Sequence, residues 1–161
     1  MTTLIAAGIL CLSAQAAPMP VILDTDIGSD IDDTWALCMM LGSPELDVQL
    51  ITTAYSDTPA KTRLAAKVLE RLGRTDIPIG TGKKTDGKPL NQLKWIEGYR
   101  LDDYPGVVHE DGVQALIDAV HAAPEPITIC VLGPQTNIAE ALKRDPAIAK
   151  NARIVAMAGS V

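Results

Sequence analysis

The sequence predicts an α/β fold with an open, mostly parallel sheet and helices on both faces. Short apolar runs of strand length alternate with longer segments whose apolar residues recur at helical spacing, and this alternation is typical of such sheets. The composition agrees, because 47% of the residues are hydrophobic while phenylalanine is absent. The core has to be built from Ala, Val, Ile and Leu, which suit helices packed on a parallel sheet.

The first half of the chain contains two strand–helix units. The apolar run at residues 21–23 predicts a buried strand over residues 21–25, and an acidic loop and a helix over residues 35–41 follow it. Residues 48–53 predict the next strand. Apolar side chains then recur at helical spacing through residues 60–72, and Gly73 ends that helix.

The second half continues the alternation around a long irregular segment, residues 80–112. A loop of that length in a compact domain is usually functional or mobile. The elements expected around it are a strand over residues 77–79, a helix over 113–120, a strand over 127–132, a helix over 138–143 and a strand over 154–157.

The N-terminal segment predicts a signal peptide. An apolar stretch over residues 4–12 is too short to span a bilayer, and a small-x-small cleavage pattern, AQA, follows at residues 14–16, although no basic residue precedes it. We expect residues 1–17 to be removed, residues 18–161 to form the domain, and the protein to be secreted or periplasmic. The other end follows directly on a strand, so we also expect a truncated chain.

Charge and cysteine usage exclude several classes of function. A net charge of −6 and the lack of a Lys/Arg cluster argue against nucleic acid or an anionic membrane as a partner. No Cys or His spacing resembles a zinc site. Two cysteines follow the signal segment, Cys38 and Cys130. Free buried thiols are the simpler interpretation, and a disulfide between them stays open.

Five aspartates gather in the ten residues DTDIGSDIDD, straight after the first strand. They are Asp24, Asp26, Asp30, Asp32 and Asp33. Carboxylates a few ångströms apart repel by roughly 4 kcal/mol per pair at an effective dielectric constant near 20, so the cluster has to be solvated, partly protonated or neutralised by a cation. Gly28 lets the backbone curl around a bound group, and so many hard oxygen ligands suit Ca²⁺ or Mg²⁺.

A second loop is expected at the same edge of the sheet. Ligands of open parallel sheets bind beyond the carboxyl ends of the strands, where residues 133–137 follow a strand as the acidic loop does. A plain alternative makes Asn137 and Glu140 a helix-capping box. An EF-hand is excluded because no Glu stands at its twelfth position. A haloacid-dehalogenase-type phosphatase stays open, but it leaves Asp32 and Asp33 unexplained.

Two motifs carry a resemblance to a known family. Residues 24–37 read DTDIGSDIDDTWAL, residues 133–142 read GPQTNIAEAL, and a weaker match covers residues 51–57 and 76–79. Together they resemble the inosine/uridine-preferring nucleoside hydrolase family, from about residue 21 to residue 159. The resemblance implies an α/β fold that holds Ca²⁺ at the bottom of a pocket and hydrolyses the N-glycosidic bond of ribonucleosides, a reaction of nucleoside salvage.

The resemblance also implies roles for single residues. Asp26 matches the metal ligand that also acts as general base, Asp33 matches the second carboxylate on the ion, and Thr136 matches the residue whose backbone carbonyl coordinates it. Asp32 matches the aspartate that binds the ribose hydroxyls, and Asp57 stands where the family often has an Asn near the sugar. The implied partner is a small ribonucleoside, with no membrane partner after signal cleavage, while a homo-oligomer stays open.

Some positions depart from the family pattern or stay ambiguous. The acidic loop has two extra residues, including Asp30, which is either a loop carboxylate or a substituted ligand. His109 resembles a residue of a loop that lines the pocket, or it is a surface histidine. Trp95 and Tyr99 either stack on a base or anchor their own loop. The family's last metal-binding Asp and the neighbouring His acid are expected beyond Val161. A complete chain of this length would therefore have poor activity or none, and the alternative is a non-catalytic remnant of the fold that binds Ca²⁺ or ribose.

Overall fold

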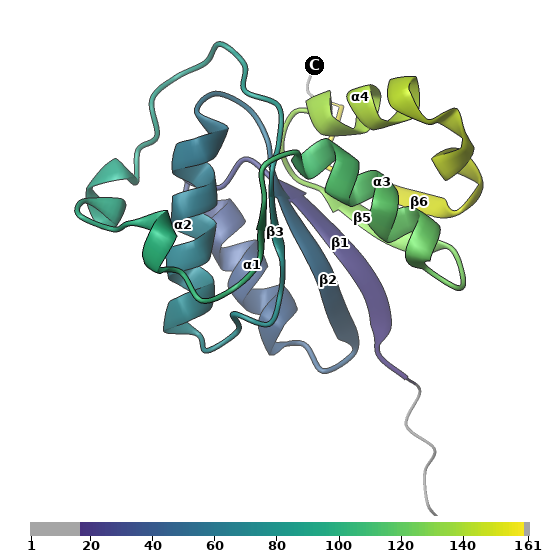
Figure 1. The fold of residues 1–161 in the computed structure, drawn as a ribbon, viewed down its shortest axis with the longest axis horizontal. Coiled ribbons are helices and arrows are strands. Elements are labelled where there is room, and N and C mark those ends of the chain that lie inside the picture. The colour runs from purple at the N-terminus through teal and green to yellow at the C-terminus, as the bar shows by residue number, and fades with distance from the viewer. Residues whose placement is uncertain (1–16, 160–161) are drawn as a thin grey trace, which may run out of the picture.

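The computed structural model of the chain describes residues 17–159, so the expected signal peptide lies outside the described residues except for its last position. Within that range, strands and helices alternate from end to end (Figure 1). The elements are β1 (Met19–Thr25), α1 (Asp32–Gly42), β2 (Leu46–Thr53), α2 (Thr58–Arg71), β3 (Ile79–Thr81), the 3₁₀ helices η1 (Leu93–Ile96) and η2 (Leu101–Asp103), β4 (Val108–His109), α3 (Gly112–Ala122), β5 (Ile127–Val131), α4 (Thr136–Arg144), η3 (Pro146–Lys150) and β6 (Ala152–Ala156).

The strands form one parallel sheet in the order β4-β3-β2-β1-β5-β6. The chain order reverses between β1 and β5, which are neighbours. Beyond the carboxyl ends of two such strands the connections run in opposite directions and leave a crevice. The acidic loop, residues 26–31, follows β1, and residues 133–135 follow β5. The topology therefore brings both loops to this crevice.

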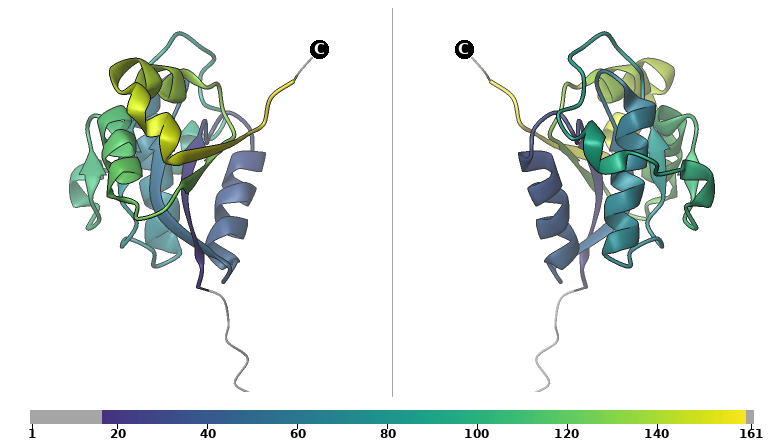
Figure 2. Two further views of the ribbon diagram at one scale, coloured as in Figure 1. Left: turned by 90° about the vertical axis from the view of Figure 1, so that its right-hand side faces the viewer. Right: turned by 90° about the vertical axis from the view of Figure 1, so that its left-hand side faces the viewer.

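Helices cover both faces of the sheet, as the sequence predicted. Val21 and Leu23 pack with α1 and α2, whereas Ile22 between them packs with α3 and α4, because successive side chains of a strand point to opposite faces. Figure 2 shows α1 on one face and α3 and α4 on the other. Each fully buried Leu, Ile or Val contributes about 1.5–3 kcal/mol to these two cores.

Two strands differ from the expectation, and the three 3₁₀ helices were not predicted. The third strand lies at Ile79–Thr81, two residues late, because Pro78 has no N–H for the ladder and its carbonyl instead accepts a bond from Ile51. The irregular segment also contains β4, a two-residue strand that pairs with β3 and is too short to leave a periodic pattern. The other elements lie within a few residues of their predicted bounds.

The structure also answers two smaller questions. Cys38 and Cys130 are free thiols, as the simpler interpretation expects, but both are half-buried rather than fully buried. From residue 17 to residue 159, no helix combines the length and the apolar character that a bilayer crossing requires.

Candidate functional site

A polar cavity of about 370 Å³ opens beyond the carboxyl ends of β1 and β5. Four of the clustered aspartates, Asp26, Asp30, Asp32 and Asp33, line it on one side. Residues 133–135 line the other side, and Met157, just past β6, completes the wall. The prediction that the two loops face one site is therefore confirmed.

Asp26 and Gly133 hold the two loops in contact. A Cβ atom at position 133 would lie 2.8 Å from the Cβ of Asp26 and 2.9 Å from its Oδ1, closer than real side chains approach. Glycine is required here because the backbone of one loop lies directly on the carboxylate of the other. The Asp26 carboxylate thus sits beside the loop that leads into Thr136.

Asp33, in the first turn of α1, lines the same cavity as Asp26. Its carboxylate is buried and accepts a hydrogen bond from the Thr25 hydroxyl. Burial raises the pKa of Asp33, the bond from Thr25 offsets part of this rise, and the nearby charges of Asp26 and Asp32 raise it further. Asp33 therefore lies close enough to Asp26 and to Asp32 for their charges to act on it, and a cation bound near Asp33 would relieve part of this repulsion.

Asp24 does not belong to this group, although it stands in the same motif. It is fully buried, and its Oδ1 accepts hydrogen bonds from Thr52 (2.6 Å) and Asn137 (2.7 Å) while its Oδ2 has no partner. Burial raises its pKa to about 6, against the effect of those two bonds. Asp30 and Asp32 are exposed. The raised pKa of Asp24 favours its neutral form, and solvent screens the charges of Asp30 and Asp32. Because Asp24 is buried and bonded elsewhere, a cation shared by all five carboxylates is ruled out.

Asn137 is a site residue that the sequence interpretation missed. Its amide nitrogen donates to Asp24 and to the carbonyl of Thr53 (3.0 Å), and its Oδ1 accepts from the backbone N–H of Lys83 (2.9 Å). The capping-box interpretation is wrong, since α4 begins without a side-chain cap and Glu140 pairs with Lys83 instead. The buried Asp24 needs a donor, and this need outweighs the local capping preference.

Lys61 is the second residue that was missed. It is fully buried in α2, and its Nζ donates to the carbonyls of Asp26 and Ile27 and to the hydroxyl of Ser29. Burial lowers its pKa, while the nearby acidic groups act in the opposite direction. A signal did exist, because Lys61 precedes Leu64 by three positions and so lies on the apolar face of its helix.

Three predicted site residues are not part of the cavity wall. Asp57 caps α2 by accepting from the N–H of Ala60 (3.4 Å). His109 is exposed on β4, with β3 and β2 between it and β1. Thr136 is the first residue of α4, and its hydroxyl donates to the carbonyl of Pro134 (3.5 Å). The structure therefore brings neither Asp57 nor His109 to the wall of this cavity.

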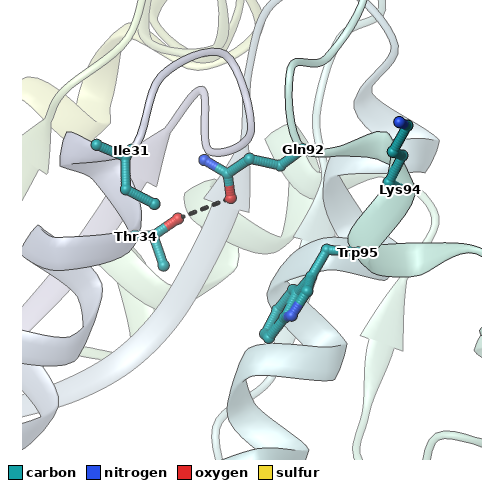
Figure 3. A pocket seen from close by; sticks show the side chains of 5 residues that line it. All are labelled: Ile31, Thr34, Gln92, Lys94 and Trp95. Atoms are coloured by element: carbon teal, nitrogen blue, oxygen red, sulfur yellow. Dashed lines mark hydrogen bonds between the residues drawn. The ribbon is translucent and has the colours of Figure 1, made fainter.

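The two aromatic residues of the long loop anchor it to α2. The ammonium of Lys67 lies 5.3 Å from the ring centroid of Trp95, and the Tyr99 hydroxyl donates to Glu70 (2.8 Å). Trp95 faces a separate, apolar cavity of about 460 Å³, whose other wall is the start of α1 (Figure 3). These contacts support the anchoring interpretation over stacking on a base.

The donor set fits part of a metal site. Among residues 17–159, no three His, Cys, Asp or Glu side chains are grouped so that they could hold an ion. The described chain instead offers two carboxylates in one cavity wall, Asp26 and Asp33, with residues 133–135 lining the same cavity. Hard oxygen ligands suit Ca²⁺ or Mg²⁺, and Ca²⁺ takes roughly six to eight of them. Further ligands would have to complete the shell.

Comparison with known proteins places the chain among nucleoside hydrolases. Residues 21–161 match the family described as inosine-uridine preferring nucleoside hydrolase. The chain is 37% identical over 154 residues to the pyrimidine-specific ribonucleoside hydrolase RihA of Citrobacter koseri, an overlap of 89% of this chain and 49% of that one. It is 37% identical over 156 residues to the non-specific ribonucleoside hydrolase RihC of Salmonella typhi, an overlap of 91% and 50%.

A solved structure agrees. A plant nucleoside hydrolase, the PpNRh1 enzyme, superposes with a TM-score of 0.75 at 34% identity, over 89% of this chain and 48% of that one. The chain spans about half the length of the curated relatives it matches. The family is metal-dependent. The resemblance drawn from the two motifs is confirmed and the phosphatase alternative is wrong: the chain belongs to the inosine-uridine preferring nucleoside hydrolase family.

Proposed function

We propose that this chain supplies the metal-binding and ribose-binding residues of a calcium-dependent nucleoside hydrolase, which splits a ribonucleoside into free base and ribose. One observation carries the proposal: Asp26, Asp32 and Asp33 line a single cavity with the loop that leads into Thr136. The relatives named above are ribonucleoside hydrolases, which supports the same chemistry here.

Hydrolysis of an N-glycosidic bond sets clear demands on the site. Water has to attack C1′ of the sugar while the C1′–N bond breaks and its electron pair leaves with the base. A bound Ca²⁺ would lower the pKa of a water molecule in the cavity. Asp26, half-buried and next to Asp33, is placed to accept the proton of that water as its oxygen bonds to C1′.

The other residues would bind the cation and the ribose. Asp33 is held by the Thr25 hydroxyl and would share the cation with Asp26, and Thr136 would add its backbone carbonyl. Asp32 is exposed in the cavity wall, where its carboxylate can accept bonds from the ribose hydroxyls and stabilise positive charge on the sugar. Asp57 and His109 stay outside this assignment, because Asp57 caps α2 and His109 lies on β4, away from the two loops that line the cavity.

The proposal is tested by assaying the purified chain with inosine and with uridine and measuring free base by chromatography. Any release by this chain should stop in EDTA, return with Ca²⁺ and be absent in Asp26→Asn. A second candidate function, non-catalytic binding of Ca²⁺ or ribose, is favoured by the pair of carboxylates, which is fewer than a full ligand set. Calcium-dependent stabilisation without base release would support that candidate. Neither effect would contradict both.

The location of the protein is a separate proposal. The apolar segment and the AQA pattern at residues 14–16 support export to the periplasm or the medium. Cell fractionation with N-terminal sequencing of the mature chain tests it. An N-terminus near residue 17 in the exported fraction is expected, and an intact Met1 in the cytosol would contradict export.

A further inference from the structure

Lys61 places a fully buried positive charge directly beneath the acidic loop. A lysine ammonium has three donors, and here three acceptors receive them: the carbonyl of Asp26, the carbonyl of Ile27 (3.1 Å) and the hydroxyl of Ser29 (2.8 Å). Burying a charge is costly unless it is fully hydrogen-bonded. All three acceptors belong to the loop, so the loop and the lysine depend on each other.

The pattern of these bonds fixes the backbone at Asp26. Two consecutive carbonyls, on Asp26 and Ile27, point at the same ammonium and so set the direction from which the Asp26 side chain leaves the chain. The later part of the loop has other anchors. The backbone N–H of Asn91 donates to the carbonyl of Gly28 (2.9 Å), and the side-chain amide of Gln92 donates to the carbonyl of Asp30 (2.7 Å). Lys61 therefore holds the part of the loop that carries the proposed general base.

The ammonium leaves the carboxylates free. It contacts carbonyl and hydroxyl oxygens rather than carboxylates. Its charge still lies close enough to Asp33 to offset a small part of the rise in the pKa of that carboxyl. Part of the repulsion in the loop is thus offset from below, and the carboxylate oxygens of Asp26 and Asp33 keep their side toward the cavity open.

We propose that Lys61 is a positioning residue that holds the acidic loop in its binding shape before any cation arrives. The claim about cation binding rests on the proposed metal site, whereas the claim about loop order does not. Electrostatics alone makes the opposite prediction, because a lysine beside the site repels a cation and its removal should tighten binding. The sign of the change therefore separates a positioning role from a bystander charge.

The test compares Lys61→Met with Lys67→Met, a matched control on the same helix whose ammonium lies over Trp95. Hydrogen exchange in EDTA is measured for residues 26–31. We expect exchange there to be at least about tenfold faster in Lys61→Met, as for the loss of hydrogen bonds to a charged group, with little change in β2. In a Ca²⁺ titration the same variant should bind roughly tenfold more weakly, and Lys67→Met should match the wild type.

Unchanged exchange at residues 26–31, or tighter Ca²⁺ binding, in Lys61→Met would overturn the proposal. If that variant does not fold, Ser29→Ala takes its place, since it removes one acceptor of the same ammonium. Its expected result is a smaller increase in exchange at the same residues, and no increase overturns the proposal. A wild-type chain that binds no Ca²⁺ would refute the proposed metal site, and the exchange data would then decide on Lys61 alone.

Discussion

The side-chain amide of Asn137 donates a hydrogen bond of 2.7 Å to the buried carboxylate of Asp24, across 113 positions of the sequence. The same side chain bonds to the carbonyl of Thr53 and to the N–H of Lys83. One amide thus joins the carboxyl ends of β1 and β2, the loop after β3 and the first turn of α4. The loops after β1 and before α4 line the cavity, so Asn137 ties the two elements beside the site to the rest of the sheet.

Replacing Asn137 by Ala should destabilise the chain strongly. Three hydrogen bonds disappear, and the buried groups of Asp24 and Thr53 lose partners that water cannot replace. We expect the free energy of unfolding to fall by roughly 2–4 kcal/mol, measured by urea denaturation. Gln135→Ala, at an exposed neighbouring position, should stay within about 0.5 kcal/mol of the wild type. Equal stability of both variants would show that the amide network contributes little.

The raised pKa of Asp24 predicts a pH dependence of stability. The carboxyl ionises near 3.8 in the unfolded chain but near 6 in the folded one, because it is buried. The fold therefore favours the protonated form, so this contribution to stability is complete below the unfolded pKa and is lost as the pH rises through the folded pKa. A shift of about two pKa units corresponds to at most about 3 kcal/mol.

The measurement is urea unfolding in EDTA between about pH 4 and pH 7, for the wild type and Asp24→Asn. Asparagine keeps the acceptor for Thr52 and Asn137 but cannot ionise. The wild type should therefore lose stability relative to the variant as the pH rises. Parallel curves would mean that the folded chain does not hold the proton of Asp24.

The sheet and the approach of the two loops could be predicted from the sequence, for a geometric reason. The run 21–25 and the run 127–132 predict parallel strands, and parallel strands end at one edge, so the loops that follow had to approach each other. The partners inside the crevice could not be read in the same way. Asp24 differs from Asp26 in being fully buried, yet the two stand in the same short motif and belong to the same residue type.

Long-range partners explain the rest of what was missed. Lys61 sits on an apolar helical face, which indicates burial, but its three acceptors lie more than thirty positions earlier in the chain. The local signal at Asn137 favoured a cap, and the distant Asp24 outweighed it. Local patterns predict elements and edges, whereas the pairing of buried polar groups depends on contacts that no local pattern encodes.

The contact between Gly133 and Asp26 predicts that Gly133→Ala separates the two loops. The new methyl group would overlap the Asp26 side chain, and such overpacking costs about 1–3 kcal/mol. We expect this loss in unfolding free energy together with weaker calcium-dependent stabilisation. Gly42→Ala is the control, since a Cβ atom there meets nothing within 4 Å. If both variants behave like the wild type, the loops do not touch as described.

Thermal stability measured with and without Ca²⁺ shows which of the clustered aspartates bind the ion and which do not. At a free Ca²⁺ concentration of about 100 times Kd, binding should stabilise the wild type by about 2.7 kcal/mol. Asp26→Asn should lose this gain while staying at least as stable as the wild type in EDTA, because it removes one of the charges that raise the pKa of Asp33. Asp30→Asn should keep the gain, since Asp30 is exposed and its carbonyl, bonded to Gln92, is unchanged. Loss of the gain in Asp30→Asn would make Asp30 a ligand, and a gain kept in Asp26→Asn would remove Asp26 from the metal site.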